Sequence, residues 1–189
     1  MSAAHPSDRD CNIAAAAARI TRPVVLVGLM GVGKSTVGRK LASLLARDFV
    51  DADEAIAEAA QRSIPEIFET FGEAHFRDGE RRVIARLIGE SHGVIATGGG
   101  AFVDPETRAL VLERGIAVWI DCDVDTLVER TARRGNRPLL KQGDPKEILT
   151  RLAAERAPFY AQAHIRVVSE TGPHADTARA IIEAIDQWL

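Results

Sequence analysis

The chain of 189 residues has the length and composition of one globular domain, with 46% hydrophobic and 27% charged residues. Its formal net charge of −3 excludes the bulk basic character of most nucleic-acid binders, and no apolar run approaches the roughly 20 residues that span a membrane. We therefore expect neither nucleic acid nor a membrane as a partner. Cys11 and Cys122 have no metal-site or disulfide spacing, which favours free thiols in a reducing cytoplasm.

Residues 1–20 differ from the rest of the chain because they combine charges with an alanine run, Ala14 to Ala18. They lack the positive start and long apolar core of a secretory signal, and Asp8 and Asp10 weaken the alternative of an organelle presequence. We predict a flexible tail, or a short helical arm, outside a single domain over residues 21–189.

Five short apolar segments are typical of buried strands. They are Val24–Val27, Phe49–Val50, Gly93–Thr97, Ile116–Ile120 and Ile165–Val168. Helical spacing or helix-start signals separate them. The expected helices cover or begin at about 37–45, 55–60, Ser63, 73–90, 105–114, 125–133, 146–160 and 181–189. This alternation predicts an α/β fold: a three-layer α/β/α domain with a five-stranded parallel sheet, whose ligands bind beyond the carboxyl ends of the strands.

The segment Gly28–Thr36, GLMGVGKST, follows the first predicted strand and has the spacing of a phosphate loop. Its glycines let backbone N–H groups surround phosphate oxygens, and the following helix adds its positive end. We predict that Lys34 reaches the outer phosphates and that the Ser35 hydroxyl ligates Mg²⁺. The predicted nucleotide-binding residues here are Gly31, Val32, Gly33, Lys34, Ser35 and Thr36.

A phosphate loop alone does not distinguish a nucleotide switch, a motor and a kinase. The Asn-Lys-x-Asp and Asp-x-x-Gly motifs of GTPase switches do not occur in the sequence. A mechanical ATPase would need more chain for its partner surfaces. The sequence therefore favours a small phosphoryl-transfer enzyme, which must bind and cover an acceptor.

Asp51 and Asp53 follow the second predicted strand. In an extended segment, residues i and i+2 point to the same side, so both carboxylates could serve a metal ion and an acceptor hydroxyl. The alternative is a solvated acidic turn.

Arginines in apolar or Gly-rich surroundings suit an anionic acceptor. Arg77 follows Phe76 on a predicted helix, and Arg156 precedes Ala-Pro-Phe-Tyr. For each of these two arginines, the alternative interpretation is an ordinary position on the solvated face of a helix. Arg133 to Pro138 opens a Gly/Pro-marked segment, so we predict a basic lid loop over about 130–145. Its rival is a nucleic-acid patch, which the acidic balance and the lack of interleaved aromatics disfavour.

Taken together, these motifs resemble the shikimate kinases, phosphate-loop kinases related to the nucleoside monophosphate kinases. The resemblance runs from about Arg22 to Ser169 and rests on an ordered set. The set is the phosphate loop, Asp51-Ala-Asp53, Ser63-Ile-Pro-Glu-Ile-Phe68, Gly72-Glu73, Phe76-Arg77, Thr97-Gly-Gly-Gly-Ala101, Arg137-Pro-Leu-Leu140 and Arg156-Ala-Pro-Phe-Tyr160.

This resemblance implies transfer of the γ-phosphoryl group of ATP to the 3-hydroxyl of shikimate, in the pathway to chorismate and aromatic amino acids. Arg77 and Arg156 would hold the shikimate carboxylate, and Asp53 would bind the reacting hydroxyl and take its proton. Gly98, Gly99 and Gly100 would line the acceptor site, the last two offering backbone N–H groups.

On the donor side, the resemblance implies that Asp51 acts on Mg²⁺ through water, beside Ser35. Lys34 and Arg137 would stabilise charge on the phosphates, and Arg130 would stack on the adenine. Glu80 matches a family position that orients Arg77.

Two rival functions remain open. A gluconate kinase of the same architecture also binds a carboxylate and hydroxyls, although the glycine run with Asp53 and Arg156 favours shikimate. A non-catalytic nucleotide-binding module would not need Lys34, Asp53, Arg77, Arg137 and Arg156 together. No extra apolar face is evident in the sequence, so we expect a monomer.

Overall fold

The computed structural model describes residues 8–90, 93–132, 143–169 and 172–189, and the side chains from residue 13 onward within these ranges. Five parallel strands form one sheet in the order β2-β3-β1-β4-β5. The strands are β1 (Val24–Val27), β2 (Phe49–Asp51), β3 (Val94–Ala96), β4 (Ile116–Asp121) and β5 (Ile165–Val168). The predicted fold class is confirmed, and each strand lies within one residue of its expected bounds.

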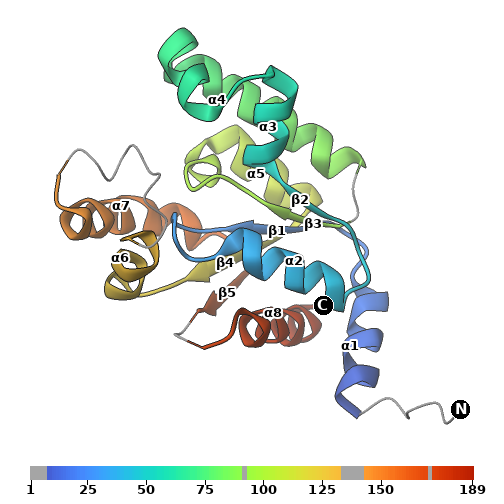
Figure 1. Cartoon of the computed structure of the whole chain (residues 1–189). Helices are drawn as coiled ribbons and strands as arrows, with labels where there is room; N and C mark the ends of the chain where they lie inside the picture. Colours follow the sequence, from blue (N-terminus) through green and yellow to red (C-terminus); the bar gives the residue numbers. More distant parts are fainter. Residues whose placement is uncertain (1–7, 91–92, 133–142, 170–171) are drawn as a thin grey trace, which may run out of the picture.

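Helices cover both faces of the sheet, as a parallel sheet requires (Figure 1). Helices α2 (Lys34–Leu44) and α8 (His174–Trp188) pack on one face, and α5 (Pro105–Arg114) and α7 (Pro145–Tyr160) on the other. The remaining helical elements are α1 (Asp8–Arg19), α3 (Ala52–Ala60), α4 (Ile64–Glu90), the 3₁₀ turn η1 (Ala101–Val103) and α6 (Val124–Ala132).

The central strand β1 is completely buried because neighbours pair with it on both sides. All four of its residues, Val24–Val27, are 0% exposed. Val25 pairs with Ile95 of β3 and with Ala117 of β4. The carboxyl end of β1 is therefore fixed from both sides, and the phosphate loop begins on this rigid support.

Helix α3 and the first half of α4 stand away from the sheet, at the top of Figure 1. They share a small apolar cluster of their own, made by Ile56, Ile67 and Phe76. The predicted capping box is present, because Ser63 and Glu66 exchange side-chain and backbone hydrogen bonds. Two helices meet in α4 at Gly72, whose φ of 79° and ψ of 173° only glycine adopts easily.

The N-terminal segment forms a helix, which was the predicted alternative to a flexible tail, and this helix packs on the domain. Residues Asp8–Arg19 form α1, which lies beside α8 (Figure 1), and Ala16 and Ile20 are only 3% and 1% exposed. Arg47 donates hydrogen bonds to the carbonyls of Ala17 and Ile20. The alanine run is thus part of the domain, because its small side chains let two helices approach closely.

We expect Ile20→Ala to lower the free energy of unfolding by about 2–4 kcal/mol, because it removes a fully buried side chain from the packed core. Urea unfolding followed by circular dichroism measures this. The matched control is Arg19→Ala, which removes an exposed ion pair to Asp186 and should cost less than about 1 kcal/mol. Equal, small losses in both variants would contradict the packing of α1 on the domain.

Candidate active site

The phosphate loop connects β1 to α2 and is shaped by glycines with positive φ. Gly31 and Gly33 have φ values of 87° and 93°, and α2 begins at Lys34. The Lys34 ammonium donates hydrogen bonds to the carbonyls of Gly28 at 2.7 Å and Leu29 at 2.8 Å, and the residue is 8% exposed. The predicted donor residues Gly31 to Thr36 therefore form a compact turn with a helix N-terminus and a buried ammonium, as phosphate binding requires.

Ser35 and Asp51 contact each other between the first turn of α2 and the end of β2. The Ser35 hydroxyl donates to Asp51 Oδ2 at 2.5 Å, and Asp51 Oδ1 accepts from the Asp53 N–H at 3.1 Å. Hard oxygen ligands of this kind suit Mg²⁺. The described residues contain no cluster of three or more His, Cys, Asp or Glu side chains that could hold a metal ion. The pair therefore fits an ion that takes its remaining ligands from phosphate and water.

The structure corrects the local geometry predicted for Asp51 and Asp53. They do not alternate along one strand, because Asp51 is the N-cap of α3 and Asp53 lies in the first turn of that helix. Asp53 nevertheless reaches the end of the neighbouring strand β3. A Cβ atom placed on Gly98 would lie 2.9 Å from Asp53 Oδ1.

The run Gly98–Gly100 is the point where the predicted acceptor residues meet. The distance from a Cβ atom added to each glycine to the nearest atoms shows how closely other residues approach the run. On Gly99 such an atom would lie 3.2 Å from Arg156 Nη1, and on Gly100 it would lie 2.6 Å from Arg77 Nη2. The run also borders the phosphate loop, since a Cβ atom added to Gly99 would lie 3.4 Å from the Met30 backbone nitrogen. One carboxylate and two guanidinium groups, from α3, α4 and α7, thus approach the same short backbone segment.

Arg77 is oriented by Glu80, one turn further along α4. Arg77 Nη1 contacts Glu80 Oε2 at 2.6 Å, and Glu80 is only 2% exposed. Burial raises the pKa of the Glu80 carboxyl, and the Arg77 charge opposes this rise. Among the described residues, Glu80 Oε1 has no hydrogen-bond partner, and it lies 2.9 Å from a Cβ atom placed on Gly98. This oxygen therefore borders the same glycine run as Asp53.

We expect Glu80→Gln to raise the KM for the acceptor several-fold, because Arg77 loses its shorter and more buried ion pair and keeps only Glu73 at 3.4 Å. The same variant should gain stability relative to wild type as the pH rises. A folded-state pKa above the ordinary value of 4.5 means that ionising Glu80 costs stability, and this cost is absent below pH 4.5, where the carboxyl is protonated in both states. The gain should grow as the pH rises from about 4.5 and level off above the folded-state pKa.

Urea unfolding of both proteins between pH 4 and pH 8 measures this difference. Burial raises the pKa of Glu80 despite the pairing with Arg77, so the stability of Glu80→Gln relative to wild type should be more favourable at pH 8 than at pH 4. If the free energy of unfolding of Glu80→Gln, relative to wild type, increased as the pH fell, this would contradict a raised pKa for Glu80.

Arg130 lies on α6 between the phosphate loop and the end of β5. Its Nη1 atom is 3.3 Å from the Val32 carbonyl oxygen and 3.3 Å from Ser169 Oγ. It therefore lies beside the donor loop. Arg137 and most of the predicted lid, residues 133–142, lie outside the described residues. The described ends of the predicted lid, 130–132 and 143–145, lead out of α6 and into α7.

One residue of the site was given no role from the sequence. Tyr160 lies one helical turn after Arg156 on α7, and its hydroxyl donates a hydrogen bond to the Gly99 carbonyl. The sequence offers two signals for it: its place in the family motif Arg156-Ala-Pro-Phe-Tyr160, and its spacing of four residues from Arg156, which places both side chains on one face of a helix.

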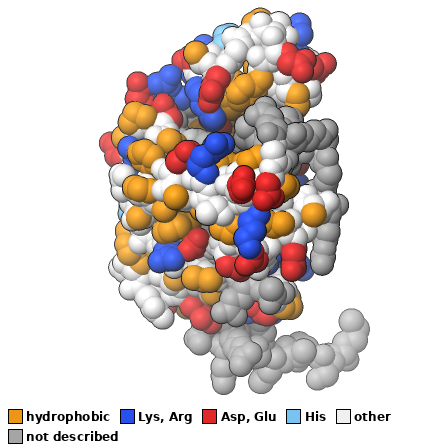
Figure 2. Space-filling model, turned by 90° about the vertical axis from the view of Figure 1, so that its left-hand side faces the viewer, with side chains coloured by type: hydrophobic (Ala, Val, Ile, Leu, Met, Phe, Trp, Pro, Cys, Tyr) orange, Lys and Arg blue, Asp and Glu red, His pale blue; other side chains and the backbone are white. Residues whose placement is uncertain are grey.

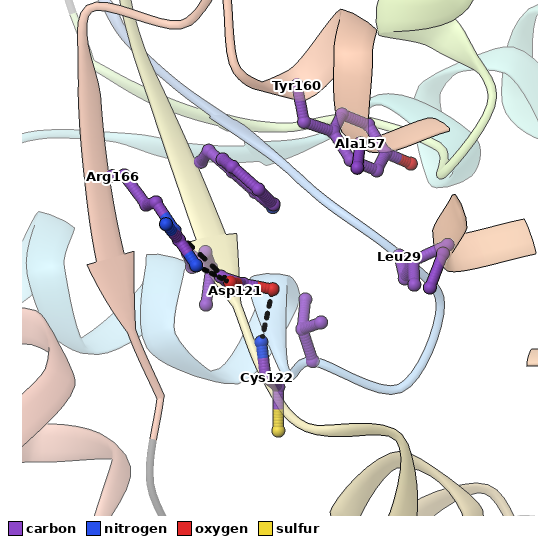
Figure 3. A pocket seen from close by; sticks show the side chains of 10 residues that line it. Leu29, Asp121, Cys122, Ala157, Tyr160 and Arg166 are labelled. Carbon is purple, nitrogen blue, oxygen red and sulfur yellow. Dashed lines mark hydrogen bonds and ion pairs between the residues drawn. The ribbon is translucent and has the colours of Figure 1, made fainter. Parts of the chain in front are cut away.

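A cavity of about 220 Å³ lies beside Tyr160, between the phosphate loop, β4 and α7 (Figure 3). Its lining is largely apolar and includes Leu29, Trp119 and Ala157. At its edge Asp121 accepts hydrogen bonds from Arg166, the shorter at 2.6 Å, and from the Cys122 N–H. Asp121 is thus engaged in a local ion pair with Arg166.

Comparison with known proteins identifies the family. The model of the shikimate kinases matches residues 30–186. A shikimate kinase of Novosphingobium aromaticivorans is 68% identical over 175 residues, which cover 90% of this chain and 91% of that protein. The chain belongs to the shikimate kinase family.

Solved structures agree with this assignment. Shikimate kinase from Acinetobacter baumannii, in complex with shikimate, is 40% identical with a TM-score of 0.85 and covers 90% of this chain and 96% of that one. A gluconokinase from Sinorhizobium meliloti has a TM-score of 0.61 at 16% identity, and the match covers 89% of this chain and 94% of that one. The second likeness extends to the fold alone, so the architecture is shared by kinases that differ in acceptor.

Proposed function

We propose that this member of the shikimate kinase family transfers the γ-phosphoryl group of ATP to the 3-hydroxyl of shikimate, giving shikimate 3-phosphate and ADP. One observation carries the proposal beyond family membership. Asp53, Arg77 and Arg156 come from three different helices and converge on Gly98–Gly100, next to the phosphate loop. A binding module without catalysis would have no need of such a second site.

The acceptor side of the site suits a molecule with one carboxylate and several hydroxyls. Arg77 and Arg156 bind the carboxylate through charge-assisted hydrogen bonds. Asp53 accepts a hydrogen bond from the reacting hydroxyl and takes its proton as the oxygen attacks the γ-phosphorus. Gly98, Gly99 and Gly100 allow the acceptor to approach the backbone because side chains there would collide with these groups.

The donor side of the site holds and neutralises the triphosphate. Backbone N–H groups of the phosphate loop bind its oxygens, and Lys34 turns from the loop carbonyls toward the outer phosphates. Ser35, with Asp51 behind it, would hold Mg²⁺, which supplies charge neutralisation at the phosphates when bound. Arg130 contacts the adenine, and Arg137 would stabilise charge on the transferred group. Positioning and charge thus supply most of the rate.

The partners and cellular location that we propose are those of an enzyme with small, diffusible substrates. Acidic and basic side chains alternate over the face seen in Figure 2, which supports small-molecule partners rather than nucleic acid. No helix among the described residues is long and apolar enough to cross a membrane. We propose that the protein acts as a monomer in the cytoplasm.

A coupled assay of ADP release tests the proposal directly. Shikimate, gluconate and nucleoside monophosphates are offered in parallel, each with ATP and Mg²⁺. We expect turnover with shikimate and at most trace turnover with the others. No turnover with shikimate would overturn the proposal, and comparable kcat/KM values for gluconate would favour a gluconate kinase.

A further inference from the structure

The glycine run of the acceptor site is held by the C-terminal end of α7 and by α5. From α7, the Tyr160 hydroxyl donates to the Gly99 carbonyl. From α5, Arg108 Nη1 donates to the carbonyls of Phe102 at 3.0 Å and Val103 at 2.9 Å, and its guanidinium lies over the Phe159 ring. The backbone that follows β3 is therefore fixed by side-chain donors and not by a further strand.

The Tyr160 hydrogen bond fixes more than the ring itself. Tyr160 is 2% exposed and packs against Trp119, with 5.9 Å between ring centroids, but it also borders the 220 Å³ cavity of Figure 3. Packing on that side leaves space for the ring to move. Burial raises the pKa of the Tyr160 hydroxyl, which keeps it protonated as a donor. The hydroxyl also interacts with the Arg156 guanidinium one turn earlier on α7. Its bond to the Gly99 oxygen sets the direction of that carbonyl.

The carbonyl of Gly99 and the N–H of Gly100 belong to one peptide unit. This unit is planar, and in its trans form the two groups point in opposite directions. A donor that holds the Gly99 oxygen toward α7 therefore holds the Gly100 N–H away from α7. A glycine on each side leaves the unit unusually free to rotate, because neither residue restricts φ and ψ as other residues do.

We propose that Tyr160 is a positioning residue for the acceptor, which fixes the Gly99–Gly100 peptide so that the Gly100 N–H faces the bound substrate beside Arg77. This inference rests on the proposed function and adds a residue to it. The hydroxyl makes no contact with the reacting groups itself. Its effect should appear in acceptor binding, and the donor site should be unaffected.

The test uses Tyr160→Phe, which removes only the hydroxyl. We expect the KM for shikimate to rise about 3- to 10-fold, as for the loss of one neutral hydrogen bond, with the KM for ATP within about twofold of wild type. The matched control is Phe159→Leu, which loosens the same turn of α7 but leaves the bond to Gly99 intact. It should lower the thermal midpoint without changing the ratio of the two KM values.

A further measurement separates this inference from its alternatives. Amide hydrogen exchange at Gly100 should be faster in Tyr160→Phe even without substrates, so this readout survives if shikimate is not the acceptor. Unchanged exchange or equal shifts in both KM values would each overturn the proposal.

Discussion

Arg156→Ala should raise the KM for shikimate about 10- to 150-fold while the KM for ATP changes less than about threefold. The expected size is that of a hydrogen bond to a charged group, about 1.5–3 kcal/mol. Arg156 approaches Gly99 on the acceptor side and reaches from α7, whereas the described donor residues lie in the phosphate loop and α6. Initial rates with each substrate varied at saturating concentration of the other give both constants.

Arg156→Lys is the matched control for this prediction. It keeps the positive charge but loses the planar fork that binds two carboxylate oxygens at once, so its KM for shikimate should lie between wild type and the alanine variant. Circular dichroism spectra identical to wild type should accompany both variants, because Arg156 is only half-buried. An equal rise in the KM for both substrates would show that Arg156 does not bind the acceptor carboxylate.

Asp53→Asn should lower kcat about 10²- to 10⁴-fold and leave ATP binding nearly unchanged. The amide keeps the shape of the carboxylate but cannot take the proton of the attacking hydroxyl. Asp53 lies beside Gly98 on the acceptor side, and it is not one of the residues that bind the triphosphate in the proposal. Single-turnover rates measure the chemical step, and fluorescence titration with ATP measures donor binding.

The adjacent residue Glu54 provides the control for Asp53. It occupies the same first turn of α3 but pairs with Arg39 on the exposed surface at 3.1 Å. Glu54→Gln should keep kcat within about twofold of wild type, as for other exposed ion pairs. Normal turnover in Asp53→Asn, or an equal loss in both variants, would remove Asp53 from the mechanism.

The sheet and much of the site were predictable because strong local signals coincide with tertiary demands. β-branched runs such as Val24–Val27 mark strands that are buried on both faces, and a parallel sheet brings their ends together. The motifs at Gly28, Asp51 and Gly98 therefore meet at one edge of the sheet. Their order along the chain carried the family resemblance, which the comparisons confirm.

Other features were not predictable because they depend on contacts distant in sequence. Asp53 was placed on an extended segment, but the Asp51 side chain caps a helix there and turns the chain. The alanine run before Arg19 has no visible apolar stripe, and its partner α8 lies more than 150 residues later in the chain. The role of Tyr160 was not predictable because it depends on the position of the Gly99 carbonyl, which is 61 residues earlier in the chain.

The packing of α1 against α8 brings the two ends of the domain together, since the Arg19 side chain pairs with Asp186 at 2.6 Å. In Figure 1 this helix pair lies at the opposite pole from α3 and the first half of α4. A surface tether attached at Leu189 would therefore hold the protein at the pole opposite α3. Immobilised or single-molecule assays built on this end should preserve turnover, whereas a tether placed on α3 should slow it, because Asp53 lies on that helix.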